Sequence, residues 1–401
     1  MELQARTPEG AAVVALAEKL VAKLAERAAE HDRTATFPHA SIRALRDADY
    51  FTAPIPAQLG GLGVSSVHDL VVASGRLARG DASVAIGVNM HLVAVMALVR
   101  RWHMARAAGS QRRERAFAAS IEAVVRERQV IAAAMSEPGQ DLTRPATRAV
   151  RTDGGWRIDG HKIFCTMSPA ATTLLTSVGF VDDDGVERYG YVQIPAEAEG
   201  LRINDDWDAL GMRASGSHSV TLEGVLLPAS ALRGGFRAGD TVAYLDRNLP
   251  SGLFHAAASL GIAEAAFEKA TSRGRIEGDA RAEMLVAESA IDLSAARAVI
   301  ARAAGLVDAH YEATPTAEGS DAELAAVFAE GQAAKTFVGE AATRVVDHAL
   351  ALSGGAGYVN RSPLARAYRD VRAGAFMHPL GANRAYAFLA RTALGMRPEL
   401  A

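Results

Sequence analysis

The sequence has 401 residues, of which 49% are hydrophobic, so it can bury a core large enough for two or three domains. Its formal net charge is −3, with acids and bases interspersed, which excludes the basic surfaces that bind nucleic acid or anionic membranes. The N-terminus shows no leader pattern and no apolar run reaches roughly 18 residues, so we expect a cytoplasmic protein whose partners are small molecules and copies of itself. A lone cysteine, Cys165, excludes an internal disulfide and a multi-thiolate metal site.

Helical periodicity dominates the first third of the chain. Apolar residues recur at helical spacing between 8 and 29, and a second helix follows Pro38, which suits a first helical turn. The prolines and glycines of 54–63 (PIPAQLGGLG) predict a turn. Further helices are expected at about 66–80, 83–103 and 109–127. The middle one is apolar on several sides, which is typical of a buried helix, and it contains His91.

The periodicity changes near Gln129. Between about 146 and 224, short segments rich in β-branched residues alternate apolar and polar positions and are separated by Asp-Gly and Gly-Gly turns, which predicts an antiparallel β domain. Helical periodicity then resumes and continues to the end, with a loop expected at 312–321. The chain is therefore predicted to be mostly α with a central β domain, in three parts that cover 1–128, 129–235 and 236–401.

Four segments carry a resemblance to a known family. They are AMSEPGQD (134–141), DGGWRIDGHKIFCT (153–166), WDALGMRASGSHSVTLEGVLLP (207–228) and LSGGAGYVNRSPLARAYRDVRAG (352–374). In this order and at these distances they resemble the acyl-CoA dehydrogenase superfamily, and PIPAQLGGLG is similar to its N-terminal loop. The resemblance implies an N-terminal helical domain, a central antiparallel β domain and a C-terminal four-helix bundle. It also implies a bound flavin and assembly as a homotetramer or dimer.

The resemblance further implies which residues contact the flavin ring. Met135 and Ser136 match the segment beside the pyrimidine part of the isoalloxazine, where the Ser136 hydroxyl can stabilise negative charge. Phe164 falls where the family places an aromatic ring over the flavin, and Thr166 where a hydroxyl reaches N5. A stacking face with a few placed hydrogen bonds is the pattern expected for a flat apolar ring with a polar edge. Strand alternation directs Cys165 to the opposite face, so we expect no catalytic thiol.

Three more residues are implied at the edges of the cofactor. Arg213 matches a segment near the flavin edge, and Gly354 and Gly355 match a segment that contacts the adenosine diphosphate part across a subunit interface. A helix end followed by a turn would use the same two glycines equally well. The family's usual glutamine three positions before the paired glycines is Ala351 in this chain. The departure affects the adenine end, so the cofactor is expected to be reduced FAD or FMN.

The reaction of the parent family depends on a carboxylate that this sequence lacks. Acyl-CoA dehydrogenases remove an α proton with a glutamate. The segment that usually carries it reads RDVRAGAFMHPLGANRAY, with no acid after Asp370, and the alternative position on the first C-terminal helix is Ser251. His378 occupies the loop of the missing glutamate, and His91 lies in the helix that the resemblance places facing flavin and substrate.

Through this pair of histidines the chain resembles the flavin-dependent monooxygenase branch of the superfamily, which contains the dibenzothiophene monooxygenase and the amino-sugar N-oxygenases. The resemblance implies that a separate flavin reductase supplies reduced flavin, that O2 forms a C4a-hydroperoxyflavin, and that a small organic substrate is oxygenated. Such chemistry needs a dry pocket and a group that exchanges protons near pH 7, which suits an imidazole with a near-neutral pKa. We therefore predict His91 and His378 as catalytic residues.

Two other functions stay open at the level of sequence. One is an acyl-CoA dehydrogenase with a displaced base, and the other is a catalytically silent flavin-binding subunit. The ordinary alternative for His91 is a core histidine with satisfied hydrogen bonds. The sequence contains no metal-binding motif, so no metal is expected.

Overall fold

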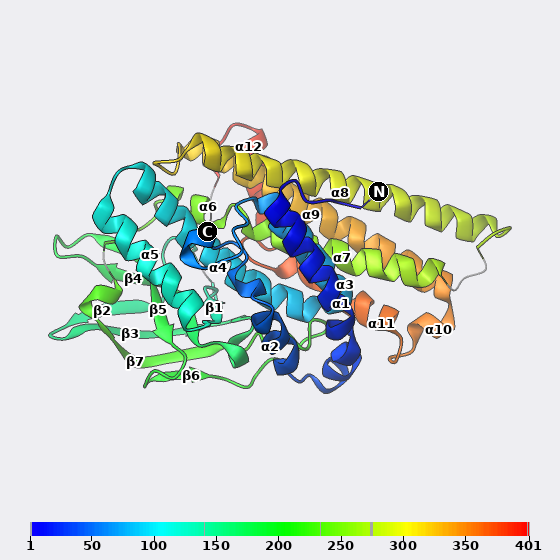
Figure 1. Ribbon diagram of the computed structural model, residues 1–401, viewed down its shortest axis with the longest axis horizontal. Coiled ribbons are helices and arrows are strands. Elements are labelled where there is room, and N and C mark those ends of the chain that lie inside the picture. The colour runs from blue at the N-terminus through cyan, green and yellow to red at the C-terminus, as the bar shows by residue number, and fades with distance from the viewer. Residues whose placement is uncertain (1, 140, 233, 273–275, 399, 401) are drawn as a thin grey trace.

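The computed structural model describes residues 2–139, 141–232, 234–272, 276–398 and 400. Figure 1 shows the β sheet at one end of the molecule and the long C-terminal helices extending from there to the opposite end. The N-terminal helices lie across the middle of this view (Figure 1). This succession of helices, sheet and helices confirms the predicted fold class.

Three of the five N-terminal helices begin at side chains that cap their free N–H groups. The five helices are α1 (Pro8–Thr34), α2 (His39–Asp47), α3 (Val67–Gly80), α4 (Ala82–Ala107) and α5 (Gln111–Arg126). Thr7, Ser66 and Asp81 accept hydrogen bonds from the first turns of α1, α3 and α4, respectively. The predicted turn at 54–63 contains one turn of 3-10 helix, Ala57–Leu59, and another lies just before it at Tyr50–Thr52.

Helix α4 is the predicted buried helix. An 18-residue window within it has a mean hydropathy of 2.0, which by length and composition would suffice to cross a membrane. However, 78% of that window is buried inside the protein, as expected for a core helix that is apolar all round. Its neighbours α5, β1 (Ile131–Ala134) and β4 (Thr173–Val181) share a hydrophobic cluster with it.

The central sheet is mixed rather than purely antiparallel. The strands besides β1 and β4 are β2 (Arg148–Thr152), β3 (Gly155–Lys162), β5 (Glu187–Pro195), β6 (Leu201–Ile203), β7 (Val220–Pro228) and β8 (Phe236–Arg237). Their order is β6-β7-β3-β2-β4-β5-β8. Both β1 and β2 run parallel to β4, β1 along its first half and β2 near its end. The expected all-antiparallel pairing is wrong there because the chain between β1 and β2 leaves the sheet and returns to the same edge of β4.

The C-terminal helices form the predicted bundle. They are α6 (Val242–Asn248), α7 (Ser251–Thr271), α8 (Ala280–Ala313), α9 (Asp321–Ser353), α10 (Gly355–Tyr358), α11 (Pro363–Asp370) and α12 (Ala382–Ala393). A 3-10 segment, Val371–Phe376, lies between α11 and α12, and two others lie in the region of the sheet, at Ser168–Ala170 and Ala229–Ala231. Helices α7, α8 and α9 pack against one another, and α12 packs on α9. The loop expected at 312–321 separates α8 from α9.

The two helical parts share one hydrophobic core. Helix α3 packs against α1 on one side and against α7 on the other. Its approach to α7 is close, because a Cβ added to Gly261 would lie 2.3 Å from the carbonyl oxygen of Gly75. The three domains predicted at 1–128, 129–235 and 236–401 therefore stay a prediction. In the structure, the helices of the first and third ranges pack into one core.

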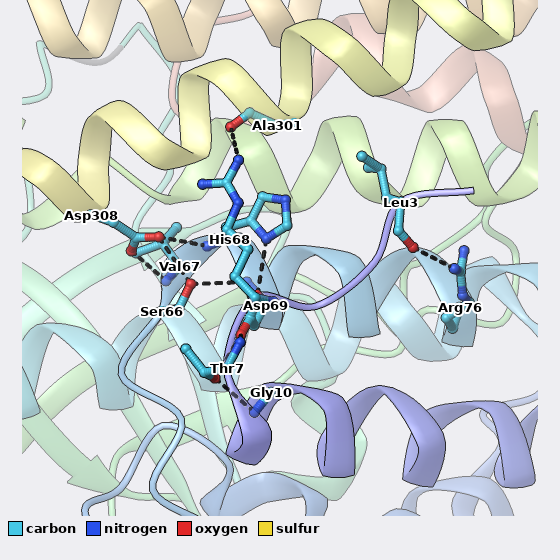
Figure 2. Close-up of polar contacts among 11 residues, drawn as sticks. Leu3, Thr7, Gly10, Ser66, Val67, His68, Asp69, Arg76, Ala301 and Asp308 are labelled. Carbon is cyan, nitrogen blue, oxygen red and sulfur yellow. Dashed lines mark hydrogen bonds and ion pairs between the residues drawn. The ribbon is translucent and has the colours of Figure 1, made fainter. Parts of the chain in front are cut away.

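A buried carboxylate fixes the N-terminal segment to α3 (Figure 2). Asp69 accepts hydrogen bonds from the backbone N–H groups of Arg6 (2.8 Å) and Thr7 (2.9 Å), and from the Thr7 hydroxyl (2.7 Å). The ring of His68 lies 3.0 Å away. Burial alone would raise the pKa of Asp69, but the hydrogen bonds from His68, Thr7 and Arg6 hold it below its usual value.

A second carboxylate joins α3 to α8 in the same region. Asp308 accepts from the backbone N–H groups of Val67 (2.6 Å) and His68 (3.3 Å) and from the Ser66 hydroxyl (2.9 Å). Figure 2 shows how these groups converge from the start of α3 onto α8. A carboxylate is favourable at a helix N-terminus because the free N–H groups and the helix dipole are both oriented toward it.

Replacing Asp69 with alanine should lower the free energy of unfolding by about 2 kcal/mol, because the partly buried N–H and O–H donors of Arg6 and Thr7 then lose their acceptor. The measurement is urea unfolding at fixed protein concentration and neutral pH. Asp183→Ala is the matched control, since the Asp183 side chain is 85% exposed and its ion pair with Arg151 lies on the surface. Equal stability of the two variants would show that the N-terminal segment is not held in this way.

Candidate active site

A cavity lies where the sheet and the helices meet. Its apolar wall comes from α4, β1 and the start of β4, including Met90, Val93 and Leu175. Its polar side chains come mainly from α6, α7 and the loop before α12; they are Ser177, Tyr191, Tyr244, Arg247, Asn248, Ser251 and His378. Among the described residues that line it, none is an aspartate or a glutamate. An apolar pocket with a few convergent polar groups is the usual form of a small-molecule site.

His378 is held in this cavity by a buried lysine. Lys335 of α9 donates hydrogen bonds to the carbonyl oxygens of Met377 and Leu380, the latter at 2.8 Å, which flank the histidine. On its other side, the His378 Nε2 lies 3.3 Å from the hydroxyl of Tyr244. Lys335 therefore fixes the backbone around His378, and the Tyr244 hydroxyl fixes the direction of its imidazole ring.

The electrostatic surroundings keep His378 neutral. Burial, together with the positive charges of Lys335, Arg384 and Arg247, lowers its pKa to about 3. Burial also lowers the pKa of Lys335 to about 7 and holds that of Tyr244 well above its usual value. The expected near-neutral pKa is therefore wrong for His378. The ring is a neutral donor and acceptor of hydrogen bonds across the physiological range, rather than a group that titrates near pH 7.

His91 occupies a different place. Its Nε2 lies 3.0 Å from the carbonyl oxygen of Phe51, and its Nδ1 accepts a hydrogen bond from the N–H of Ile131, also at 3.0 Å. The side chain is fully buried, and it is absent from the described lining of the cavity. Burial lowers its pKa to about 4. This geometry opposes the predicted catalytic role of His91, because Nδ1 is engaged in fixing β1 to α4 and Nε2 in fixing the 3-10 turn Tyr50–Thr52 to α4.

The segment between β1 and β2 is folded around Glu137. This carboxylate accepts hydrogen bonds from the N–H groups of Ala146 (2.6 Å) and Thr147 (2.8 Å) and from Lys162 Nζ (2.7 Å). The side chains of Glu137 and Lys162 are 2% and 0% exposed. Their buried ion pair therefore fixes the chain that carries Met135 and Ser136 against the end of β3.

The residues predicted to contact flavin form a surface that we call the ring platform: Met135, Ser136, Phe164 and Thr166. The backbone of Ser136 pairs with Ile163, which places the two segments side by side. Phe164 is 59% exposed and has a φ of +56°, a strained conformation for a bulky side chain that is typical of functional sites. Met135 also lines the cavity, so the platform and the cavity are continuous.

The platform has the chemistry that a flavin ring requires. Phe164 offers an exposed aromatic face, and Trp207 packs edge-on against it with ring centres 6.1 Å apart. The Thr166 hydroxyl is fixed by a hydrogen bond from Ser217 at 2.9 Å. Cys165, in contrast, is fully buried and burial raises the pKa of its thiol to about 12, which is unsuitable for a nucleophile. The platform therefore fits an apolar ring with a polar edge.

The remaining predicted cofactor residues lie elsewhere. Arg213 donates to the carbonyl oxygens of Asp32 (2.9 Å) and Ala209 (3.1 Å), so its guanidinium is already engaged with the protein. Gly354 ends α9 with a φ of +55°, and a Cβ added to it or to Gly355 would meet no described atom within 4 Å. The two glycines thus serve a helix end, and their contact with a cofactor across a subunit interface stays a prediction.

Sequence reasoning missed three residues of the site. Tyr244 and Arg247 are three positions apart on α6, a spacing that places both on one face of a helix and could have indicated a shared cavity. Lys335 had a weaker signal, as a lone lysine among apolar residues of a long helix. Among the described residues, no group of three or more His, Cys, Asp or Glu side chains is arranged to hold a metal ion.

The fold and the site together define a flavin-binding oxidoreductase built from a helical domain, a β sheet and a helical bundle. Three family models match the chain: acyl-CoA dehydrogenase N-terminal domain at residues 7–104, middle domain at 132–225 and C-terminal domain at 253–379. The chain therefore belongs to the acyl-CoA dehydrogenase family.

Its relatives include acyl-CoA dehydrogenases, such as a putative one of Bacillus subtilis at 31% identity, and amino sugar nitrososynthases. The chain is 32% identical to the L-evernosamine nitrososynthase of Micromonospora sp., over 97% of this chain and 91% of the relative. It is 33% identical to an amino sugar nitrososynthase of Streptomyces rubradiris, over 98% and 92%. The solved structure of KijD3 in complex with FMN and dTDP-3-amino-2,3,6-trideoxy-4-keto-3-methyl-D-glucose superposes with a TM-score of 0.89 at 30% identity, over 99% and 96%. These relatives confirm the predicted resemblance to the flavin-dependent monooxygenase branch.

Proposed function

We propose that this flavin-dependent monooxygenase oxygenates the amine nitrogen of an amino sugar carried on a nucleoside diphosphate. The observation that carries the proposal is the neutral His378 in a cavity whose described lining has no carboxylate. Removal of an α proton from an acyl thioester needs a carboxylate at this place, so the site disfavours the dehydrogenase alternative. The nitrososynthase relatives and the amino-sugar ligand of KijD3 support the choice of substrate.

The flavin is proposed to be reduced FMN, held at the ring platform by Phe164, Thr166 and Ser136. Bound reduced flavin supplies the electrons that activate O2. FMN is favoured over FAD because the adenine-side segment departs from the family at Ala351 and because KijD3 holds FMN. The proposal includes a separate flavin reductase and assembly as a homotetramer.

The cavity suits an amine that must react as a nucleophile. A protonated amine has no free lone pair, and the nearby positive charges of Arg247 and Lys335 disfavour that form. A neutral imidazole accepts a hydrogen bond from the amine without protonating it, and His378 is oriented for this by Tyr244 and Lys335. The apolar wall from α4 and β4 excludes water from the reacting atoms.

The test combines the protein with FMN, a flavin reductase, NADH and ¹⁸O₂. A nucleoside-diphosphate amino sugar should give an N-oxygenated product that carries ¹⁸O in its mass spectrum. In a parallel anaerobic experiment, acyl-CoA thioesters should leave the oxidised flavin spectrum unchanged. Anaerobic bleaching of the flavin by an acyl-CoA would contradict the proposal and would favour a dehydrogenase.

A further inference from the structure

Arg247 is an arginine at the cavity for which the residues described in the structure supply no anionic partner. Its guanidinium lies 4.1 Å from the centre of the Tyr191 ring. No hydrogen bond or ion pair joins it to any residue that the structure describes, although its side chain is partly buried and lines the cavity. Its sequence neighbour Asp246 points elsewhere, 3.5 Å from Arg100.

Two neighbouring arginines, Arg100 and Arg101, are paired within the protein. Arg100 donates to the Thr314 hydroxyl at 2.8 Å and to the carbonyl oxygen of Ala317 at 3.0 Å. Arg101 forms an ion pair with Glu318. A guanidinium stays charged in proteins, and a charge removed from water is costly unless it is paired. Of Arg100, Arg101 and Arg247, which are all at least partly buried, Arg247 is therefore the one with coordination left for a ligand.

Arg247 also stands at a junction. A groove adjoins the cavity, and the two share Ala94, Leu175, Tyr191 and Arg247. Aromatic side chains such as Phe117 and Phe236 line the groove, on which a planar base can stack. A ligand that extends from the cavity into the groove must pass the guanidinium of Arg247.

We propose that Arg247 is a recognition residue that binds the phosphate oxygens of the substrate, so that the sugar lies in the cavity beside His378 and the nucleoside lies in the groove. The inference rests on the proposed function for the identity of the substrate. Its chemical basis is independent of it, because the planar fork of a guanidinium matches two phosphate oxygens and a single ammonium does not.

The test measures binding of inorganic pyrophosphate to the FMN-loaded protein by isothermal titration calorimetry. Arg247→Met should weaken binding about 30-fold, as expected when one partner of a close charge pair is removed. Arg247→Lys should retain the charge but lose the planar fork of the guanidinium, so its affinity for pyrophosphate should lie between those of the parent protein and Arg247→Met. Arg112→Met, an exposed arginine of α5 that lies outside the described lining of the groove, is the matched control and should bind like the parent.

The outcomes separate this inference from the proposed function. Equal pyrophosphate affinity of the parent protein and Arg247→Met, both with bound FMN, would overturn the role of Arg247. Absence of pyrophosphate binding by the parent protein would overturn it as well. Binding that depends on Arg247, in a protein that oxygenates no nucleoside-diphosphate amino sugar, would support the anion site and refute the proposed function. The Lys variant keeps the test decisive if the Met variant fails to fold.

Discussion

Replacing His378 with alanine should reduce the rate of substrate oxygenation by about 100-fold or more, the usual loss when one positioned hydrogen-bonding group is removed from an active site. FMN affinity should stay within about twofold, because the ring platform is formed by other segments. The reason is geometric: the imidazole lines the cavity, contacts Tyr244 and has no described carboxylate nearby to replace it. The measurement is single-turnover oxygenation with prereduced FMN, together with a fluorescence titration of FMN.

Phe164→Ala provides the opposite pattern. Loss of the exposed aromatic face should weaken FMN binding about tenfold, while saturating FMN should restore much of the rate.

The pH profile of the oxygenation rate gives a second control. Since the pKa of His378 is about 3, its neutral form persists as the pH falls from 8 to 5, and the rate should show no acid limb from this group. An acid limb near pH 6.5 that disappears in His378→Ala would contradict the neutral assignment.

Replacing Lys162 with methionine should lower the free energy of unfolding by about 3–5 kcal/mol, because it leaves the buried Glu137 carboxylate without its cation. Burial raises the pKa of Glu137, but the charge of Lys162 and the hydrogen bonds from Lys162, Thr147 and Ala146 outweigh it, so the pKa lies below its usual value. A carboxyl group of this kind stabilises the fold above its unfolded pKa, and the contribution is lost as the pH falls through the folded value. The parent protein should therefore lose more stability than Lys162→Met between neutral and acid pH.

Urea unfolding at fixed protein concentration and several pH values measures both effects. Lys23→Met, an exposed lysine on α1, is the matched control and should change stability by less than about 0.5 kcal/mol. The double variant Glu137→Leu with Lys162→Met should recover part of the loss, because it removes the unpaired charge. A loss in Lys162→Met no larger than in the control would show that the pair does not fix the segment between β1 and β2. FMN affinity should fall with stability, since that segment carries Met135 and Ser136.

The sequence was informative where function rests on one stretch of chain. Periodicity alone predicted α4 as a buried helix. The segment that carries the catalytic glutamate in the family identified His378 as its replacement, in a loop that the structure places at the cavity. The order of helices and strands followed from local patterns for the same reason. These features depend on neighbours within a few residues, where spacing determines which face each side chain occupies.

Other features depend on contacts between distant segments. The two bonds of His91 come from Phe51 and Ile131, each 40 residues away, so its own helix could not reveal that both nitrogens are engaged. The parallel pairing of β1 with β4 joins residues 42 apart. The low pKa of His378 arises from burial and from charges on three other helices. Such effects are set by tertiary packing, which residue spacing does not encode.

The close contact between α3 and α7 has a consequence for engineering. Because the first and third parts of the chain build one core, the sheet is in effect an insert between two halves of a single helical unit. A fragment that ends before β1 would expose the apolar face of α3 and should not be expected to fold alone. Loop exchanges among relatives are therefore better made within the sheet, at the exposed turn between β4 and β5, than at the boundaries of the helical parts.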